Sequence, residues 1–483
     1  MEIHELKPQI VWRNFYALTQ IPRPSGHTEQ VANYLVDFAK KNSAEAHIDE
    51  AGNVVMRKAA TPGYENRPIV VLQAHMDMVP QKVKESDHNF ETDPILTYID
   101  GEWVRAKGTT LGSDDGMGVA AAMAVIEDKD VVHGPLEVLI TKDEETGMYG
   151  AFGLKAGELQ GKYLLNLDSE TEGEITIGCA GGMDVVCTMD YQPLNIDAEN
   201  MTAMRIQMKG LRGGHSGLEI NEGRANANKL MARMLFAAIG TESAWLCSWN
   251  GGNMRNAIPR EGEAVVVVPN GKVAQLEELV AKCRDLFNKE FEEIEHGNIE
   301  LTVEACDVPA TAVPAEIQQN LINAVMAAHD GVLRFIPTIP EIVETSSNLA
   351  IIHIGDGHAE ISILARSAVD SMKLWLCNSL RACFSMAGMK VKFEGGYSGW
   401  QPNTKSALVA TMSEVYNKMY GKKPLVQVCH AGLECGIIGV NYPDMDMASF
   451  GPTLRSPHTP DERCHIPSVE KFYNYIIELL KTL

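Results

Sequence analysis

The chain of 483 residues lacks several features that would assign it to a particular class of protein. It has no apolar run of about 18 residues, so the sequence predicts no membrane-spanning helix. Its first residues do not have the pattern of a secretion signal, and its ten cysteines include no CxxC pair. We therefore expect a soluble cytoplasmic protein whose cysteines are free thiols.

Positive charge is also scarce. The chain has 42 lysines and arginines against 64 acidic residues, and its formal net charge is −22. An acidic surface repels nucleic acid and anionic membranes, so we expect no partner of either kind. The length exceeds what one hydrophobic core supports, and two or more domains are expected.

Residues 70–80 form the stretch around which the sequence is best interpreted. They begin with an apolar run typical of a buried parallel strand. His75 and Asp77 follow two residues apart, so both side chains face the same way at the carboxyl end of the strand. Ligands bind at that end of open α/β sheets, and an imidazole beside a carboxylate is typical of a metal ligand with its orienting group. Taken alone, an ordinary polar strand end is the simpler interpretation.

Two further apolar strands end in acidic residues. The predicted strand 135–141 leads to Glu144 and Glu145, and the predicted strand 163–167 leads to Asp168. Adjacent glutamates at a strand end can diverge, so that one binds a metal ion while the other acts as a general base. A solvated run of charge explains the two glutamates equally well if they are considered in isolation.

A glycine-rich loop with Asp114 and Asp115 lies in the sequence between the strand that ends at His75 and the strand that leads to Glu144. The loop precedes a predicted helix of small residues. The glycines alone would suit a phosphate, but no GK[ST] follows and two aspartates would repel one. A carboxylate pair on a tight loop suits a cation better. The loop, the three strand ends and a late His458 on a loop stiffened by prolines together indicate a metal site.

The middle of the chain changes in style after the glycine-rich residues 178–182. Its succession of strands and helices resembles two βαββαβ lobes, which makes an internal duplication plausible. His215 lies in a glycine-rich loop before a predicted helix, and Arg366 lies at the end of a predicted strand. Considered alone, they could equally be a structural loop histidine and a surface charge.

With these motifs in view, the chain resembles the M20 family of dinuclear zinc aminopeptidases, carboxypeptidases and dipeptidases, almost from end to end. The resemblance rests on His75-Met76-Asp77, residues 112–116, residues 144–147, Asp168, residues 214–216 and His458. Residues 431–436 and 457–462 are similar to those of the family's dipeptidases. Asp115 stands where these dipeptidases often have asparagine, and Asp114 fits the ligand position.

The resemblance implies a role for each candidate residue. Two divalent metal ions, zinc with cobalt or manganese as alternatives, would be bound by His75, Asp114, Glu145, Asp168 and His458, with Asp114 as the bridge. Asp77 would orient His75, Glu144 would act as the general base on a metal-activated water, and His215 would stabilise the oxyanion. The substrate would be bound by Arg366, Asn256 and Glu434.

The same resemblance implies an architecture. We expect an α/β fold with a central, mostly parallel sheet flanked by helices in a catalytic domain formed by residues 1–183 and 398–483. Residues 184–397 would form an inserted α+β lid or dimerisation domain, and the chain would be a homodimer. His215 would then act at the metal site of its own chain or of the partner.

The implied substrate is a dipeptide with a free C-terminal carboxylate, either of the Xaa-His type or of broad range. An N-acyl amino acid deacylase of the same family would share every metal ligand and remains an alternative. A non-catalytic binding protein is disfavoured, because binding alone needs no general base. A Ser216 nucleophile is disfavoured as well, because no nucleophile elbow surrounds it.

Overall fold

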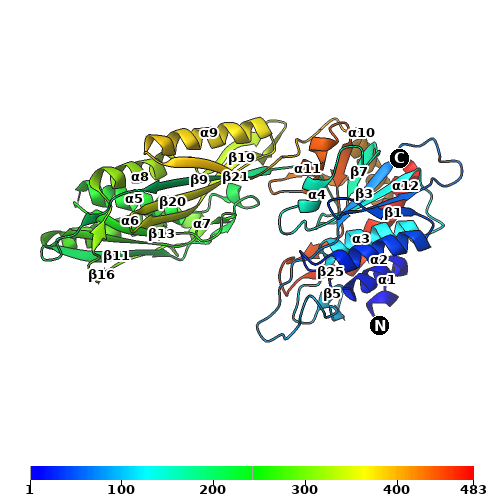
Figure 1. The fold of residues 1–483 in the computed structure, drawn as a ribbon, viewed down its shortest axis with the longest axis horizontal. Coiled ribbons are helices and arrows are strands. Elements are labelled where there is room, and N and C mark those ends of the chain that lie inside the picture. Colours follow the sequence, from blue (N-terminus) through cyan, green and yellow to red (C-terminus); the bar gives the residue numbers. More distant parts are fainter. Residues whose placement is uncertain (1, 242) are drawn as a thin grey trace. The chain divides into compact units, whose positions relative to one another are not determined.

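The computed structural model of the chain describes residues 2–241 and 243–483 (Figure 1). The chain forms two compact units. The first runs to Gly178 and is completed by Trp400–Val428 and Leu433–Leu483, whereas the second consists of Cys179–Gly399 and Cys429–Gly432. Among the described residues, no helix is long and apolar enough to cross a membrane.

The first unit is built on an eight-stranded sheet with the strand order β1-β2-β6-β3-β7-β23-β8-β22. Its strands are β1 (Glu45–Ile48), β2 (Val54–Lys58), β3 (Val70–His75), β6 (Leu136–Thr141), β7 (Tyr163–Asn166), β8 (Glu174–Cys179), β22 (Leu425–Cys429) and β23 (Asp446–Ser449). The neighbours β6, β3, β7 and β23 are parallel. This confirms the predicted α/β fold, in which the buried run after residue 70 is a central parallel strand.

The helices described in the first unit accompany this sheet: α1 (Gln9–Thr19), α2 (Glu29–Lys41), α3 (Ser113–Glu127), α4 (Tyr149–Gly153), α10 (Ala407–Tyr420), α11 (Glu434–Asn441) and α12 (Ile466–Thr482). The small residues of α3 are buried and let this helix pack closely against β3 and α1. A second, four-stranded sheet has the order β24-β25-β5-β4 and comprises β4 (Thr97–Asp100), β5 (Trp103–Ala106), β24 (Leu454–Arg455) and β25 (Arg463–His465). A short 3₁₀ helix, η1 (Ile3–Glu5), precedes α1.

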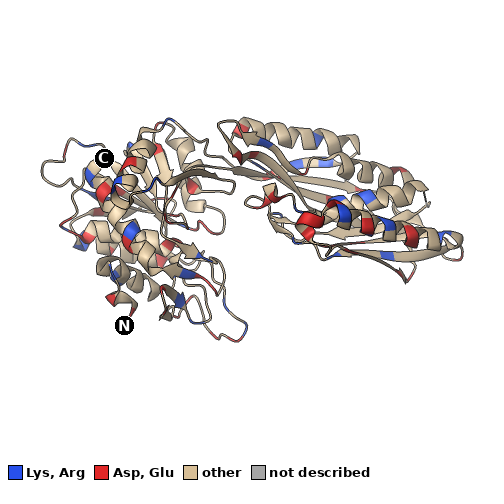
Figure 2. Ribbon diagram, turned by 180° about the vertical axis from the view of Figure 1, so that it is seen from behind, with Lys and Arg blue, Asp and Glu red and all other residues tan. Residues whose placement is uncertain are grey.

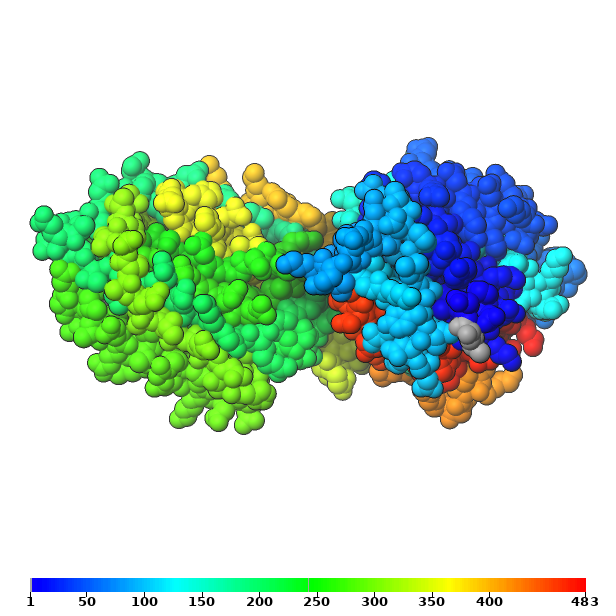
Figure 3. Space-filling model, turned by 90° about the horizontal axis from the view of Figure 1, so that it is seen from below, coloured from blue at the N-terminus to red at the C-terminus, as the bar shows by residue number. Residues whose placement is uncertain are grey.

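Segments from both ends of the chain therefore build the first unit. In the space-filling view its surface combines blue N-terminal residues with orange and red residues from the last part of the chain (Figure 3). Acidic and basic residues alternate along the ribbons of both units (Figure 2).

The second unit is a nine-stranded antiparallel sheet with the order β16-β11-β15-β13-β19-β20-β9-β21, in which β18 also pairs with β19. Its strands are β9 (Gly181–Asp190), β11 (Met201–Lys209), β13 (Trp245–Gly251), β15 (Gly262–Pro269), β16 (Glu300–Cys306), β18 (Gly331–Ile336), β19 (Ile339–Gly355), β20 (His358–Ser367) and β21 (Lys390–Tyr397). Two short pairs accompany it, β10 (Leu194–Asn195) with β17 (Thr311–Ala312) and β12 (Gly214–His215) with β14 (Ala257–Ile258).

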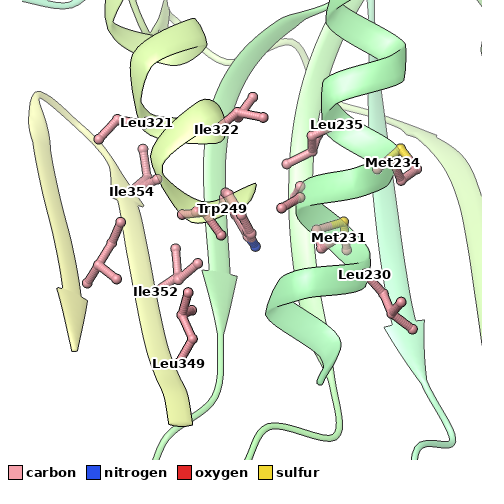
Figure 4. Close-up of a cluster of buried hydrophobic side chains, with 14 of the residues drawn as sticks. Leu230, Met231, Met234, Leu235, Trp249, Leu321, Ile322, Leu349, Ile352 and Ile354 are labelled. Atoms are coloured by element: carbon pink, nitrogen blue, oxygen red, sulfur yellow. The ribbon is translucent and has the colours of Figure 1, made fainter. Parts of the chain in front are cut away.

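Helices cover one face of this sheet and bury a large hydrophobic core. They are α5 (Ala227–Thr241), α6 (Val273–Glu290), α8 (Ala315–Ala327) and α9 (Asp370–Met386), with short helices η2 (Ile220–Glu222), η3 (Asn270–Lys272) and α7 (Glu292–Glu295) in the connections. The side chain of Trp249 on β13 is fully buried beneath α5 and α8 (Figure 4). Around it lie Leu230, Met231, Met234, Leu235, Leu321, Ile322, Leu349, Ile352 and Ile354.

Some elements were not foreseen from the sequence. The glycine-rich residues 178–182 span the end of β8 and the start of β9, and the sequence pattern does not indicate α11 or β18. The apolar pattern of the sequence predicts a strand only over residues 348–354, which is the second half of β19. Its first half contains buried polar residues whose partners lie on other strands, such as Thr345, whose hydroxyl is 2.9 Å from that of Ser367. Such long-range pairs leave no apolar periodicity in the sequence.

We expect Trp249→Ala to destabilise the second unit by about 3–5 kcal/mol, because it removes a large buried side chain and leaves a cavity. The matched control is Trp375→Ala on α9, whose residue is 54% exposed and whose loss should change stability by less than about 1 kcal/mol. Urea unfolding followed by circular dichroism measures both. Equal effects of the two substitutions would contradict this description of the core.

Candidate active site

Two clusters of potential metal ligands in the first unit share Asp114. Its Oδ1 lies 3.3 Å from Nε2 of His75, and that nitrogen is 3.7 Å from Oδ1 of Asp168. Its Oδ2 lies 3.1 Å from Nε2 of His458, and that nitrogen is 3.0 Å from Oε2 of Glu145. Within each cluster the ligand atoms lie no more than 4.8 Å apart. A carboxylate that offers one oxygen to each cluster has the geometry of a bridge between two metal ions.

Strand direction explains why these residues meet. His75 ends β3, Glu145 follows β6 and Asp168 follows β7, and these three strands are adjacent and parallel. Their carboxyl ends therefore lie at one edge of the sheet, where the first turn of α3 supplies Asp114. His458 comes from the loop between β24 and β25, where it adopts a φ of 60°.

Asp77 connects two parts of this edge. One of its oxygens lies 3.3 Å from Nδ1 of His75. The same carboxylate accepts backbone N–H bonds from Glu144 at 3.0 Å and Glu145 at 3.3 Å, and a hydroxyl bond from Ser25 at 2.7 Å. One fully buried carboxylate thus holds the backbone of both glutamates beside His75.

Asp115 points away from the two clusters. Its carboxylate accepts the backbone N–H groups of His75 at 3.3 Å and of Gly118 at 3.1 Å. It therefore fastens the first turn of α3 to the end of β3. The adjacent aspartates have different tasks, and of the two only Asp114 faces the histidine side chains.

The electrostatics of the site favour a cation. Burial raises the pKa of Asp168 and of Glu144 well above the usual carboxyl range, and neighbouring carboxylates add to the effect. Burial would also raise the pKa of Asp114, but hydrogen bonds with His458 and His75 outweigh it and hold the pKa low. Glu145 Oε1 is buried and has no hydrogen-bond partner among the described residues. Nitrogen and oxygen donors with a spare buried oxygen fit a divalent metal ion.

Glu144 lies beside the two clusters that share Asp114. It forms a third close group with His75 and Glu145, but its side chain is not part of either cluster that contains Asp114. A carboxylate beside the ligands, with its pKa raised by burial, has the character of a group that transfers protons.

The second unit holds a separate group of polar residues around Arg366. This arginine is 5% exposed, and its Nη1 donates a 2.9 Å hydrogen bond to the Tyr397 hydroxyl. Its Nε is buried without a partner, and we find no ion pair for its guanidinium among the described residues. The interpretation of Arg366 as a surface charge is therefore wrong. A buried guanidinium with unused donors is suited to bind a carboxylate.

His215 ends β12 and pairs with Ala257 of β14, and Asn256 directly precedes that strand. The backbone N–H of Ser216 donates to the Asn256 carbonyl at 2.9 Å. Nδ1 of His215 accepts N–H bonds from Gly217 at 3.2 Å and Leu218 at 3.1 Å. A neutral His215 ring therefore carries its proton on Nε2. Burial and the nearby Arg366 charge lower the pKa of His215 and favour this neutral form.

His430 is the residue of this group that the sequence did not single out. It is buried, and Nε2 of its ring lies 2.8 Å from the Ser346 hydroxyl. Burial and the charge of Arg366 lower the pKa of His430 to about 3, so the ring is neutral. Its place directly before the motif of residues 431–436 was the available signal.

Glu434 lies in the first unit and is fully buried. Its Oε2 accepts hydrogen bonds from Gln73 Nε2 and the Thr141 hydroxyl, both at 2.6 Å. Burial raises the pKa of Glu434 to about 7. The role of Glu434 in substrate binding stays a prediction from the resemblance.

Comparison with known proteins agrees with this geometry. Residues 71–482 match the profile of Peptidase family M20/M25/M40. The chain is 44% identical over 486 residues to the cytosol non-specific dipeptidase of Escherichia coli (strain K12), with 100% of this chain and 99% of that protein covered. The crystal structure of an aminoacylhistidine dipeptidase from Vibrio alginolyticus covers 100% of this chain and 98% of its own, with 43% identity and a TM-score of 0.92. An aminopeptidase from Bacillus cereus shares the fold at 15% identity and a TM-score of 0.57, with 99% and 98% covered.

We expect Asp114→Asn to weaken zinc binding by more than the roughly 10–100-fold typical of a lost orienting group, because it alters a side chain shared by both clusters. Asp115→Asn is the matched control, since that carboxylate contacts only backbone N–H groups and should weaken binding less. Calorimetric titration of chelator-treated protein with zinc measures both. A larger loss in Asp115→Asn would show that the two aspartates have been assigned the wrong way round.

Proposed function

Because this chain belongs to Peptidase family M20/M25/M40, we propose that it is a dipeptidase that uses two divalent metal ions to hydrolyse dipeptides with a free C-terminal carboxylate. The observation that carries the proposal is the pair of ligand clusters joined by Asp114. Relatives of 44% and 43% identity that span the whole chain and are named as dipeptidases support the substrate class. The range, Xaa-His or broader, follows the two names of these relatives.

The metal ligands divide into two sets around the shared carboxylate. His75 and Asp168 would hold one ion, Glu145 and His458 the other, and Asp114 both. Such nitrogen and oxygen ligands without thiolate favour zinc, with cobalt and manganese as alternatives. When bound, the ions supply an acidified water as the nucleophile and polarise the scissile carbonyl.

The residues of the chain then manage the protons. Glu144 accepts the proton of the attacking water and passes it to the leaving amine, for which its raised pKa is suited. Asp77 accepts hydrogen bonds from the backbone N–H groups of Glu144 and Glu145, and so fixes the positions from which their two side chains diverge. His215, neutral and protonated on Nε2, donates that proton as a hydrogen bond to the oxyanion that forms at the carbonyl.

Recognition of the substrate's carboxylate is assigned to the second unit. Arg366 holds it through parallel, charge-assisted hydrogen bonds from donors that are otherwise unused. Asn256, whose backbone hydrogen-bonds to the segment of His215, contributes its side-chain amide. The same proposal has three further parts, which rest on the resemblance to the family. The second unit acts as a lid, and the protein is a cytoplasmic homodimer. His215 acts in the site of its own chain or of the partner chain.

We expect the zinc-loaded chain to hydrolyse free-amine dipeptides such as Xaa-His and to lose this activity after chelation, with recovery when zinc is returned. A matching N-acetyl amino acid should be a much poorer substrate. Amidation of the dipeptide's carboxylate should lower kcat/KM by about 100-fold or more, because it leaves the buried Arg366 unpaired. A panel of these three compounds with the loaded and chelated protein tests the proposal.

Two variants complete this test. Arg366→Ala should turn over the dipeptide and its amide equally slowly, whereas Arg233→Ala, which removes an arginine paired with Glu290 elsewhere in the same unit, should behave as the unchanged chain. Preference for the N-acetyl amino acid would indicate a deacylase of the same family. Full activity in verified metal-free protein would exclude the metal mechanism.

The neighbouring glutamates give a separate prediction. Glu144→Gln should keep both metal ions and lose about 10²–10⁴-fold in kcat, because it removes the general base. Glu145→Gln should instead lower the metal content, since Glu145 lies among the ligands of one cluster. Elemental analysis and steady-state kinetics distinguish the two. The same loss of metal in both variants would contradict the division of roles.

A further inference from the structure

We propose that Arg23 and Glu462 are positioning residues that hold the metal-bridging Asp114 in place from opposite sides of the Gly112 peptide group. The inference rests on the proposed function, in which Asp114 is shared by two metal ions. Neither residue belongs to the two ligand clusters. Both are only 2% exposed, so neither is available to bind a substrate from solvent.

Glu462 accepts hydrogen bonds from the backbone N–H groups at the start of α3. Its Oε2 accepts N–H bonds from Leu111 at 2.8 Å and Gly112 at 3.0 Å. Its Oε1 accepts the N–H and hydroxyl of Ser113 at 2.8 and 2.7 Å, and the N–H of Asp114 at 3.3 Å. The whole loop that ends in Asp114 is therefore anchored to one carboxylate.

Arg23 anchors the other side of the same loop. Its Nη1 donates to the carbonyl oxygens of Met76 at 2.9 Å and Asp77 at 3.1 Å, and its Nη2 donates to that of Gly112. The space for the guanidinium depends on glycine, because a Cβ at Gly112 would lie 2.7 Å from Nη2 and one at Gly116 would lie 2.4 Å from it. Gly112 also has a φ of 69°, which glycine adopts without strain.

These contacts connect three segments that carry ligands. Glu462 follows His458 by four residues in the same loop, so its bonds fix that loop to the Asp114 loop. Arg23 fixes the Asp114 loop to the exit of β3, directly after His75. Asp114 can thus present one oxygen to each histidine only while both anchors are in place.

Glu462→Gln tests the inference, because its amide NH₂ would face backbone N–H donors while the size of the side chain is kept. We expect the affinity for at least one of two cobalt ions to fall by about 10–100-fold and the visible absorption of the cobalt-loaded protein to shift. Ser113→Ala, which removes only the hydroxyl bond to Glu462, should shift the same spectrum to a smaller extent and decides the test if Glu462→Gln does not fold.

The matched control is Glu137→Gln. Glu137 on β6 is also a buried carboxylate of the first unit. It accepts N–H bonds from Gln160 at 2.8 Å and Gly161 at 3.0 Å, and neither of these residues belongs to a loop with a proposed ligand. It should lower the unfolding temperature and leave cobalt affinity and absorption unchanged. A folded Glu462→Gln or Ser113→Ala protein with the cobalt affinity and spectrum of the unchanged chain would overturn the inference alone. Failure of the unchanged chain to bind two ions would overturn it together with the proposed function.

Discussion

The sharing of Asp114 between two histidines is the constraint on which the first unit depends. One oxygen is 3.3 Å from His75 and the other is 3.1 Å from His458, and these histidines lie at opposite ends of the chain. A single carboxylate can face both only if the sheet edge, the start of α3 and the loop before β25 are fixed together. His458 belongs to the part of the first unit that follows the second unit in the sequence, so the site is complete only when both parts of the first unit have folded together.

The crowding of acidic groups has an energetic consequence. Burial of carboxylates away from water disfavours their charged forms, and the raised pKa values of Asp168, Glu144 and Glu145 express this cost. Hydrogen bonds and nearby positive charge offset part of it, as the low pKa of Asp114 shows. A site of this kind gains free energy when a divalent ion binds, which agrees with the chemistry of a metallopeptidase family.

The second unit presents the opposite chemistry. Arg366 is a buried cation with unused donors, and His215 and His430 are kept neutral beside it because burial and its charge lower their pKa values. Anionic ligands in one unit suit metal ions, and free donors in the other suit a carboxylate.

Much of this organisation was determined by the sequence itself. Three apolar runs of strand length predicted parallel strands with a polar edge, because side-chain periodicity and strand direction are local properties. These runs lead to His75, to Glu144 and Glu145, and to Asp168. Strands with buried polar residues, such as the first half of β19, escaped prediction because their hydrogen-bond partners are distant in the sequence.

Tertiary structure decided the rest. The choice of Asp114 over Asp115 as the side chain that faces the histidines depends on how α3 docks against β3. The burial of Arg366 and Glu434, and the anchoring of the Asp114 loop by Arg23 and Glu462, depend on segments far apart in the chain. Residue types and their spacing state which groups are available. Only the folded chain determines which of them lose contact with water, and this decides their charge and their partners.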